Sequence, residues 1–180
     1  MRAKLFGGLL LALVMLASAS SAFAALNAYL QMRGEKVGAI KGNVTQKGRE
    51  DSIMVIAYSH DISAPIDASS GLPGSKIKHN VLSITKEIDR STPIIYGLLV
   101  NNEKITEFRL EFWQPSATGK EVQHFTIQLT GAHVTSIKSV MLNNKYPENM
   151  QHKEREEISF SYDTITWTWM DGGIKTTAEW

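Results

Sequence analysis

Cysteine is missing from all 180 residues of this chain, which excludes disulfide bridges, cysteine-ligated zinc sites and cysteine nucleophiles. An excess of one charge sign is also missing, because 19 Lys and Arg stand against 18 Asp and Glu. Prolines number only 5, and hydrophobic residues make up 43% of the chain, too many for a disordered polyelectrolyte. We therefore predict one globular domain.

The first 24 residues have the composition of a secretory leader. Arg2 and Lys4 precede an apolar run from Leu5 to Leu16, and small residues follow up to Ala24. A membrane anchor is the alternative, but the apolar run is shorter than the roughly 20 residues that a spanning helix needs. We predict a signal peptide at residues 1–24 and a secreted protein, with the periplasm as the other destination.

The mature domain would then span residues 25–180 and carry a nearly balanced charge. Loss of the leader removes two basic residues and leaves 17 basic against 18 acidic side chains over 156 residues. Nucleic acids and anionic membranes are bound mainly through clustered Lys and Arg. We expect neither a nucleic acid nor, after cleavage of the leader, a membrane as a partner.

Apolar and polar residues alternate through most of the mature chain, as in strands that cover a core with one face. The alternation is clearest in four runs, which are Phe108–Phe112, Phe125–Leu129, Ile158–Tyr162 and Ile165–Trp169. Further strands are predicted at Ala28–Met32, Val81–Ile88 and His133–Leu142. Asp171-Gly172 predicts a tight turn, after which Ile174–Trp180 pairs back on the preceding strand.

Two segments depart from the alternation. Ile53–Tyr58 is apolar throughout, which predicts one strand covered on both faces. Ser91-Thr92-Pro93 has a capping hydroxyl and an early proline, and apolar residues at helical spacing follow until Asn101-Asn102. Many strands and one short α-helix predict a mainly β fold, either an antiparallel β-barrel or a sandwich capped by that helix.

The segment from His60 to His79 has neither a helical nor a strand periodicity. Its centre, Ala68–Gly74, is rich in Ser, Gly and Pro. Structureless loops longer than about 12 to 15 residues are uncommon in compact domains and are often functional or disordered. The segment is therefore interpreted either as a solvated, mobile excursion or as a contact arm for a partner.

The stretch HNVLSITKEIDRSTPIIY, His79–Tyr96, resembles the signature of the type VI secretion tube proteins, the hemolysin-coregulated protein (Hcp) family. The ending Thr166–Ile174, which closes at Trp180, is similar to the C-terminus of that family. The resemblance extends over about Ala28 to Trp180. It implies an Hcp-like β-barrel with one helix that assembles into hexameric rings, which stack into the inner tube of the secretion system.

The resemblance also implies partners and a contact site. The partners would be other copies of the chain together with type VI sheath, spike and effector proteins, the effectors being carried by the rings. The long loop would contact the adjoining ring through the residues at its centre, which are Asp67, Ser69, Ser70, Gly71, Leu72, Pro73 and Gly74. Because tube subunits of the family usually have no cleavable leader, the alternative is an exported orphan ring or a monomeric binding barrel outside the injection machine.

Catalysis is not expected from this sequence. The five histidines are too scattered for a two-histidine metal motif, and His124 falls on the polar face of its strand, where a solvated side chain is typical. Glu156 and Glu157 point to opposite faces of one strand, which prevents a shared acid/base site. Trp167 and Trp169 share a face with Ile165 and are interpreted as core residues. No enzyme activity, cofactor or metal is predicted.

Overall fold

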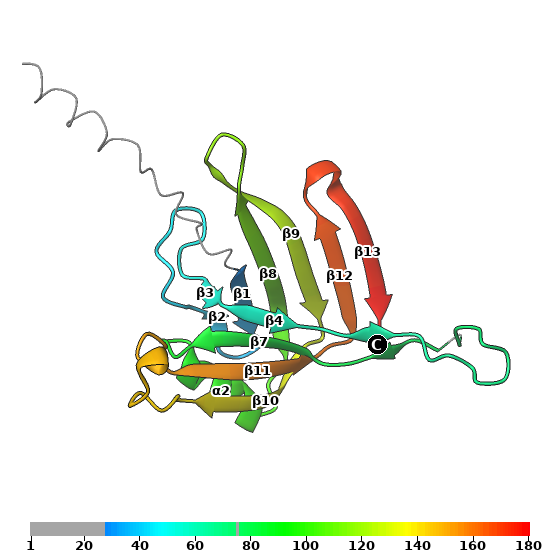
Figure 1. The fold of residues 1–180 in the computed structure, drawn as a ribbon, viewed down its shortest axis with the longest axis horizontal. Coiled ribbons are helices and arrows are strands. Elements are labelled where there is room, and N and C mark those ends of the chain that lie inside the picture. The colour runs from blue at the N-terminus through cyan, green and yellow to red at the C-terminus, as the bar shows by residue number, and fades with distance from the viewer. Residues whose placement is uncertain (1–27, 75) are drawn as a thin grey trace, which may run out of the picture.

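The computed structural model describes residues 28–74 and 76–180, and the signal peptide predicted at residues 1–24 lies outside them. The described chain forms two large antiparallel sheets, a small hairpin and the helix α2 (Thr92–Val100) (Figure 1). The seven-stranded sheet has the order β13 (Ile174–Glu179), β12 (Thr164–Trp169), β9 (Glu121–Thr130), β8 (Ile105–Pro115), β1 (Ala28–Gly34) and β2 (Gly38–Ile40), with β3 (Ile53–Val55) also paired to β1. The four-stranded sheet has the order β10 (His133–Val140), β11 (Arg155–Ser161), β7 (Leu82–Glu87) and β4 (Ala57–Ser59), and the hairpin pairs β5 (Ile62–Ser63) with β6 (Lys78–His79).

One hydrophobic core joins both sheets and the helix. The inward faces predicted from the alternation are confirmed, because Phe108 and Ile127 of the larger sheet and Phe160 of the smaller one are buried. The rings of Phe108 and Phe160 meet edge to face, with centroids 5.0 Å apart. Ile95 and Leu98 of α2 complete the core, and the helix begins and ends as predicted from Pro93 and Asn101.

The antiparallel strands and the short helix are confirmed, but closure into a barrel is not. Within residues 28–74 and 76–180 the hydrogen-bonded ladders leave β13 and β2 at the edges of the larger sheet. The smaller sheet likewise ends at β10 and β4. In Figure 1 the strands of the two sheets run across each other. The described arrangement is therefore two crossed, open sheets around a shared core.

The prediction of a single strand at Ile53–Tyr58 is wrong. The chain pairs with β1 through β3, passes Ile56, and then pairs with β7 of the other sheet through β4. Only β3 has buried side chains, while all residues of β4 are exposed. The apolar run does not mark a strand covered on both faces, because it spans the point where the chain changes sheets.

The interpretation of the β12 aromatic residues as core is partly wrong. Ile165 is buried and Trp167 packs against the core, but Trp169 is 44% exposed. Trp169 lies at the last position of β12, and its ring contacts His124 at a centroid distance of 5.8 Å. His124 is therefore not a free, solvated side chain as predicted, because it lies among aromatic rings.

The chain crosses between the sheets at a corner built around Gly131. This residue connects β9 to β10 with a φ of +61°, and the amide of Asp163, which connects β11 to β12, donates to the Thr130 carbonyl at 2.9 Å. A Cβ atom on Gly131 would lie 1.8 Å from Asp163 Oδ2 and 2.9 Å from its Cβ. Glycine is required there both for backbone conformation and for space.

Gly131→Ala is therefore expected to lower the free energy of unfolding by about 2 to 4 kcal/mol, since it adds a clash to left-handed strain. Gly119→Ala is the matched control, because Gly119 has a φ of +75° but no atom within 4 Å of an added Cβ. That control should lose only about 1 kcal/mol. Urea denaturation of both variants measures the difference, and equal losses would contradict the close approach at the corner.

Candidate functional site at the projecting loop

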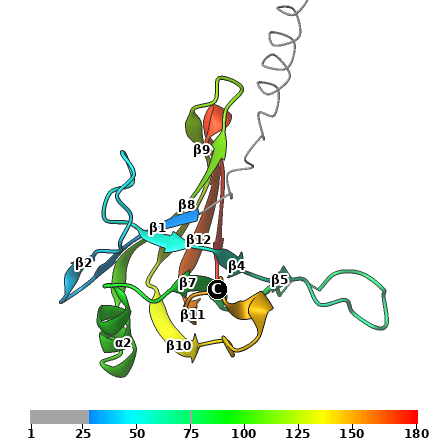
Figure 2. The same ribbon diagram turned by 60° about the vertical axis from the view of Figure 1, so that its left-hand side comes forward.

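The segment between His60 and His79 projects away from both sheets (Figure 2). The absence of periodicity predicted a structureless segment, but the segment contains paired strands. The strands β5 and β6 pair at its base with Ile62 opposite His79, and an isolated bridge joins Ile66 to Pro73 further out. The loop is therefore a narrow hairpin-like arm rather than an irregular excursion.

Asp67 organises the tip of this arm. Its Oδ1 atom accepts hydrogen bonds from the backbone amides of Ser69 at 2.9 Å and Ser70 at 2.8 Å, and also from both serine hydroxyls. Hydrogen bonds from Ser69 and then Ser70 lower the pKa of Asp67 to about 2. The Gly71 amide donates to the Asp67 carbonyl at 2.8 Å, and the left-handed φ of +68° at Gly71 turns the chain back so that the Leu72 carbonyl accepts from the Asp67 amide at 2.9 Å.

The turn presents apolar side chains to solvent. Ile66 is 71% exposed and Leu72 is 65% exposed, although the tip that carries them is held by defined hydrogen bonds. The predicted contact residues Asp67–Gly74 therefore come together at one end of the arm, with Asp67, Ser69, Ser70 and Gly71 forming the turn and Leu72 presented by it. Single exposed apolar side chains are common on protein surfaces, so it is the position of both at the tip of one projecting arm that makes them a candidate contact point.

One hydroxyl group contacts both ends of the arm at its base. Tyr162, between β11 and β12, is buried, and its Oη atom lies 2.7 Å from His60 Nε2 and 3.0 Å from His79 Nδ1. Burial raises the pKa of Tyr162 to about 12, so its phenol keeps its proton. The two ends of the arm are thus held at the junction of the two sheets.

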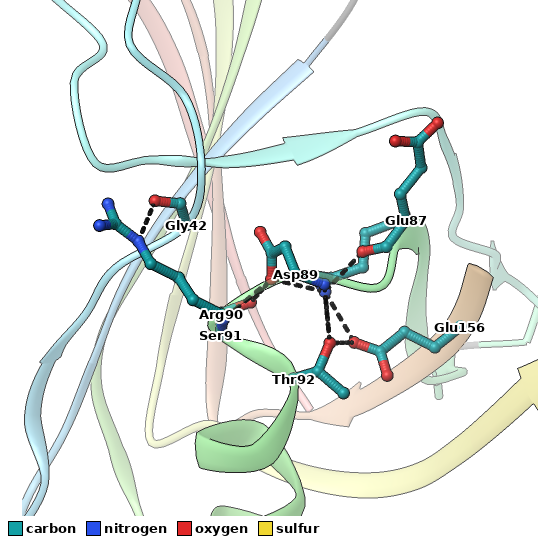
Figure 3. Close-up of polar contacts among 8 residues, drawn as sticks. Gly42, Glu87, Asp89, Arg90, Ser91, Thr92 and Glu156 are labelled. Atoms are coloured by element: carbon teal, nitrogen blue, oxygen red, sulfur yellow. Dashed lines mark hydrogen bonds and ion pairs between the residues drawn. The ribbon is translucent and has the colours of Figure 1, made fainter. Parts of the chain in front are cut away.

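A buried charge network lies at the other end of β7, beside the start of α2 (Figure 3). The side chains of Lys86 and Glu156 are both 0% exposed, and Lys86 Nζ lies 2.7 Å from Glu156 Oε1. The same ammonium group donates to Thr92 Oγ1 at 3.0 Å and lies 3.0 Å from Asp89 Oδ1. The network therefore joins the two central strands of the smaller sheet to the first turn of the helix.

Ser91 occupies the N-cap position of α2 as predicted, but its side chain does not cap the helix. The Ser91 side chain makes no capping bond, and its hydroxyl and amide both donate to Asp89 Oδ1. Burial raises the pKa of Asp89, but the bonds from Ser91 and the Lys86 ammonium outweigh it and lower that pKa below 3.8. Next to it, Arg90 Nε donates to the Gly42 carbonyl at 2.6 Å, which ties a distant loop to the same place.

The described residues give no support for a metal site. Across residues 28–74 and 76–180, no three or more His, Asp or Glu side chains lie together in a way that would hold a metal ion. Glu156 and Glu157 point to opposite faces as predicted, since the first is buried and the second exposed. In the same ranges, no helix has the length and apolar character needed to cross a membrane.

Two features of the site were missed by the sequence reasoning. Lys86 follows Leu82 and Ile84 at alternate positions, and Glu156 likewise precedes Ile158 and Phe160. Each charged residue lies on the same strand face as core residues, and the two charges have opposite sign. This pattern was a usable signal for a buried ion pair. The contact of His60 and His79 with Tyr162 had no comparable signal, because His60 lies 102 positions and His79 lies 83 positions from Tyr162 along the chain.

Comparisons with known proteins agree with this architecture. The model of the family described as "Type VI secretion system effector, Hcp" matches residues 29–169. The "Major exported protein" of Pseudomonas aeruginosa is 31% identical over 162 residues, covering 85% of this chain and 94% of that protein. A crystal structure of an Hcp protein has a TM-score of 0.80 at 26% identity, covering 87% of this chain and 98% of the other. The Hcp1 protein from E. coli EAEC 042 has a TM-score of 0.77 at 29% identity, covering 87% and 99%.

Proposed function

Since this chain belongs to the type VI secretion Hcp family, we propose that it is a structural subunit of the secretion tube, forming hexameric rings that stack and carry effectors. The single observation that supports ring stacking best is the projecting arm with Ile66 and Leu72 exposed at its tip. An arm that reaches beyond its own domain finds an apolar surface only on another molecule. In a tube of identical subunits, that molecule is a subunit of the adjoining ring.

The hydrogen-bonding edges of the sheets support assembly within a ring. In the described residues β13 is the edge strand of the larger sheet, and five of its six residues are exposed. Strand edges carry unpaired backbone groups, and head-to-tail contacts between identical subunits that close on themselves protect such groups. Six copies around an axis would use the same pair of surfaces six times.

We also propose that the protein is exported, and the route of export separates the tube subunit from the alternatives. The relative from Pseudomonas aeruginosa is named an exported protein, and the first 24 residues of this chain have the composition of a leader. A protein that leaves the cell by its own leader, and not through the machine, would be an orphan ring or a monomeric binding barrel. N-terminal sequencing of protein recovered from cells distinguishes these routes, because cleavage before Ala25 would favour independent export.

The expected result for the mature domain is a particle of about six subunits. Native mass spectrometry and negative-stain electron microscopy at micromolar concentration measure this directly. A single species below the 20.0 kDa of the full chain would contradict the ring and favour the monomeric binding barrel. Rings that never stack, under any concentration or salt, would favour the orphan ring.

A further inference from the structure

The two ends of the projecting arm share one hydrogen-bonding group. His60 lies just before β5, and His79 lies in β6. One nitrogen of each ring contacts the hydroxyl of Tyr162, His60 Nε2 at 2.7 Å and His79 Nδ1 at 3.0 Å. His79 and Tyr162 are buried, and His60 is half-buried. We call these three residues the clasp. It is the place where side chains hold the base of the arm to the junction of β11 and β12.

Aromatic rings surround the clasp, so few charges face it. Trp167 of β12 lies against His60 at a centroid distance of 6.2 Å, and Trp180 lies against Tyr162 at 5.0 Å and His79 at 6.0 Å. These rings carry no net charge, and at centroid distances of 6.0 and 6.2 Å they offer a protonated imidazole only the weak attraction of an aromatic face for a cation. Their packing means that any charge on the histidines must be balanced by the few ionisable groups nearby.

The ionisable neighbours come from three elements. Beside His60, Asp61 attracts positive charge, but its carboxylate already accepts a 2.7 Å hydrogen bond from Asn80 Nδ2. On the other side, Lys76 and Lys78 line a pocket of ≈ 530 Å³ together with His79 and Trp180, and they add positive charge. From the β11–β12 connection, Asp163 turns its carboxylate toward Gly131. The pocket also gives water and protons access to His79.

The hydrogen bonds of the clasp depend on how many of its two imidazole rings are protonated. A phenol hydroxyl donates one hydrogen bond and accepts two. With both imidazoles neutral, the Tyr162 hydroxyl donates to one ring nitrogen and accepts from the N–H of the other. With both imidazoles protonated, two N–H donors and two positive charges face one oxygen, and neither ring can accept the phenol proton. Hydrogen bonding in the clasp therefore tolerates one protonated imidazole but not two, and what opposes the first charge on His60 is its burial among the aromatic rings.

We propose that the His60–Tyr162–His79 clasp is a pH-sensitive hinge that holds the arm at neutral pH and releases its base on acidification. The released arm would fluctuate about its two ends while both large sheets stay folded. That the release would weaken stacking between rings rests on the proposed function. The release itself is a property of the single chain.

The direction of the pH effect follows from His60. Burial, and next the proximity of His79, lowers the pKa of His60 below 6.5, against the opposing effects of Asp61 and of a hydrogen bond to the Asn80 backbone. Because His60 is harder to protonate in the closed clasp than in the open arm, the closed clasp is favoured over the open arm above pH 6.5. This stabilisation is lost as the pH falls from 6.5 through the lowered value.

Amide hydrogen exchange of the full chain, read by mass spectrometry on peptides covering 60–80, tests the hinge. The amide of Asn80 donates to the Asp61 carbonyl at 3.1 Å across the base, so it reports opening. After correction for intrinsic exchange, opening should rise by between about 3-fold and about 30-fold from pH 7.5 to 5.0. The upper figure is the limit for one histidine that is protonated only in the open state.

Three variants separate the clasp from general acid sensitivity. His60→Gln keeps a hydrogen-bonding side chain without titration and should flatten the pH dependence, whereas Tyr162→Phe should give raised exchange at every pH. His152→Gln, an exposed histidine outside the arm, should behave like the wild type. A wild-type arm whose exchange does not change with pH, or an unchanged dependence in His60→Gln, would overturn the proposal. Sedimentation of rings is measured separately, so a hinge that opens in rings that never stack contradicts only the proposed function.

Discussion

Replacing Lys86 with methionine is expected to lower the free energy of unfolding by about 3 to 5 kcal/mol. The substitution leaves the carboxylate of Glu156 buried without its ammonium partner, and Glu156 Oε2 already has no hydrogen-bond partner. A second carboxylate, that of Asp89, lies on the same ammonium group. Removing the one cation therefore leaves a buried carboxylate, that of Glu156, and a partly buried one, that of Asp89, without their ammonium partner. Thermal or urea unfolding followed by circular dichroism measures the loss.

A matched surface pair provides the control. Lys138 and Glu157 lie in the same sheet at 3.5 Å, but both side chains are well exposed, so Lys138→Met should change stability by less than about 1 kcal/mol. The double variant Lys86→Met/Glu156→Leu should recover much of the loss, because it removes the fully buried charge and fills the space with apolar atoms, while the partly exposed Asp89 keeps its hydrogen bonds from Ser91. Equal effects of the two single lysine substitutions would show that the buried network does not stabilise the fold.

The Lys86→Met loss should also depend on pH. Protonation of Asp89 at low pH removes one of the charges that Lys86 neutralises, so the difference from the wild type should shrink as the pH falls. The wild type also loses stability in acid, because it loses the interaction of Asp89 with Lys86, which the variant does not have. The lowered pKa of Asp89 stabilises the fold above pH 3.8, and this contribution disappears as the pH falls through the lowered value. The two curves should therefore converge in acid.

Deleting Ala68–Pro73 is expected to abolish stacking of rings while leaving each ring assembled. The deletion removes the tip of the arm, including Leu72 and the Ile66–Pro73 bridge, but it leaves β5, β6 and the clasp in place. None of the deleted residues belongs to the hydrophobic core. Negative-stain electron microscopy under conditions in which the wild type forms tubes should show single rings.

A point variant separates the apolar contact from the length of the arm. Leu72→Asp keeps the turn and should reduce stacking at least about 10-fold, because it brings a charge into a contact that excludes water. Met150→Asp is the control, since Met150 is an exposed apolar residue on the β10–β11 connection, away from the arm. Persistent tubes after the deletion would contradict the role proposed for Asp67–Gly74.

Alternation of apolar and polar residues predicted most of the strands correctly. The period of two is a property of a single strand, so the buried face of β8, with Phe108 and Leu110, follows from the order of residues alone. The same logic failed at Ile53–Tyr58, because a run that is apolar at every position contains no information about a change of sheet. It also failed at Trp169, where the strand extends past the edge of the core.

Closure of the sheets could not be predicted from periodicity. Which strand pairs with which depends on contacts between distant segments, such as β1 with β8 or β7 with β11.

The tip of the arm was predicted as a contact site by family resemblance. The hydrogen bonds of Asp67 with Ser69 and Ser70 are local, and the run Asp-Ala-Ser-Ser-Gly was a readable turn signal.

The amino-acid order by itself determined most of the apolar side chains that face the core, the position of α2 and the resemblance to the family, since each is carried by residues close together along the chain. Only the tertiary structure decided that Lys86 meets Glu156 and that His60 and His79 share the hydroxyl of Tyr162. The partners in these contacts are separated by 70, 102 and 83 positions. The physical reason is that a contact across such a distance exists only after the strands between have paired and the sheets have packed.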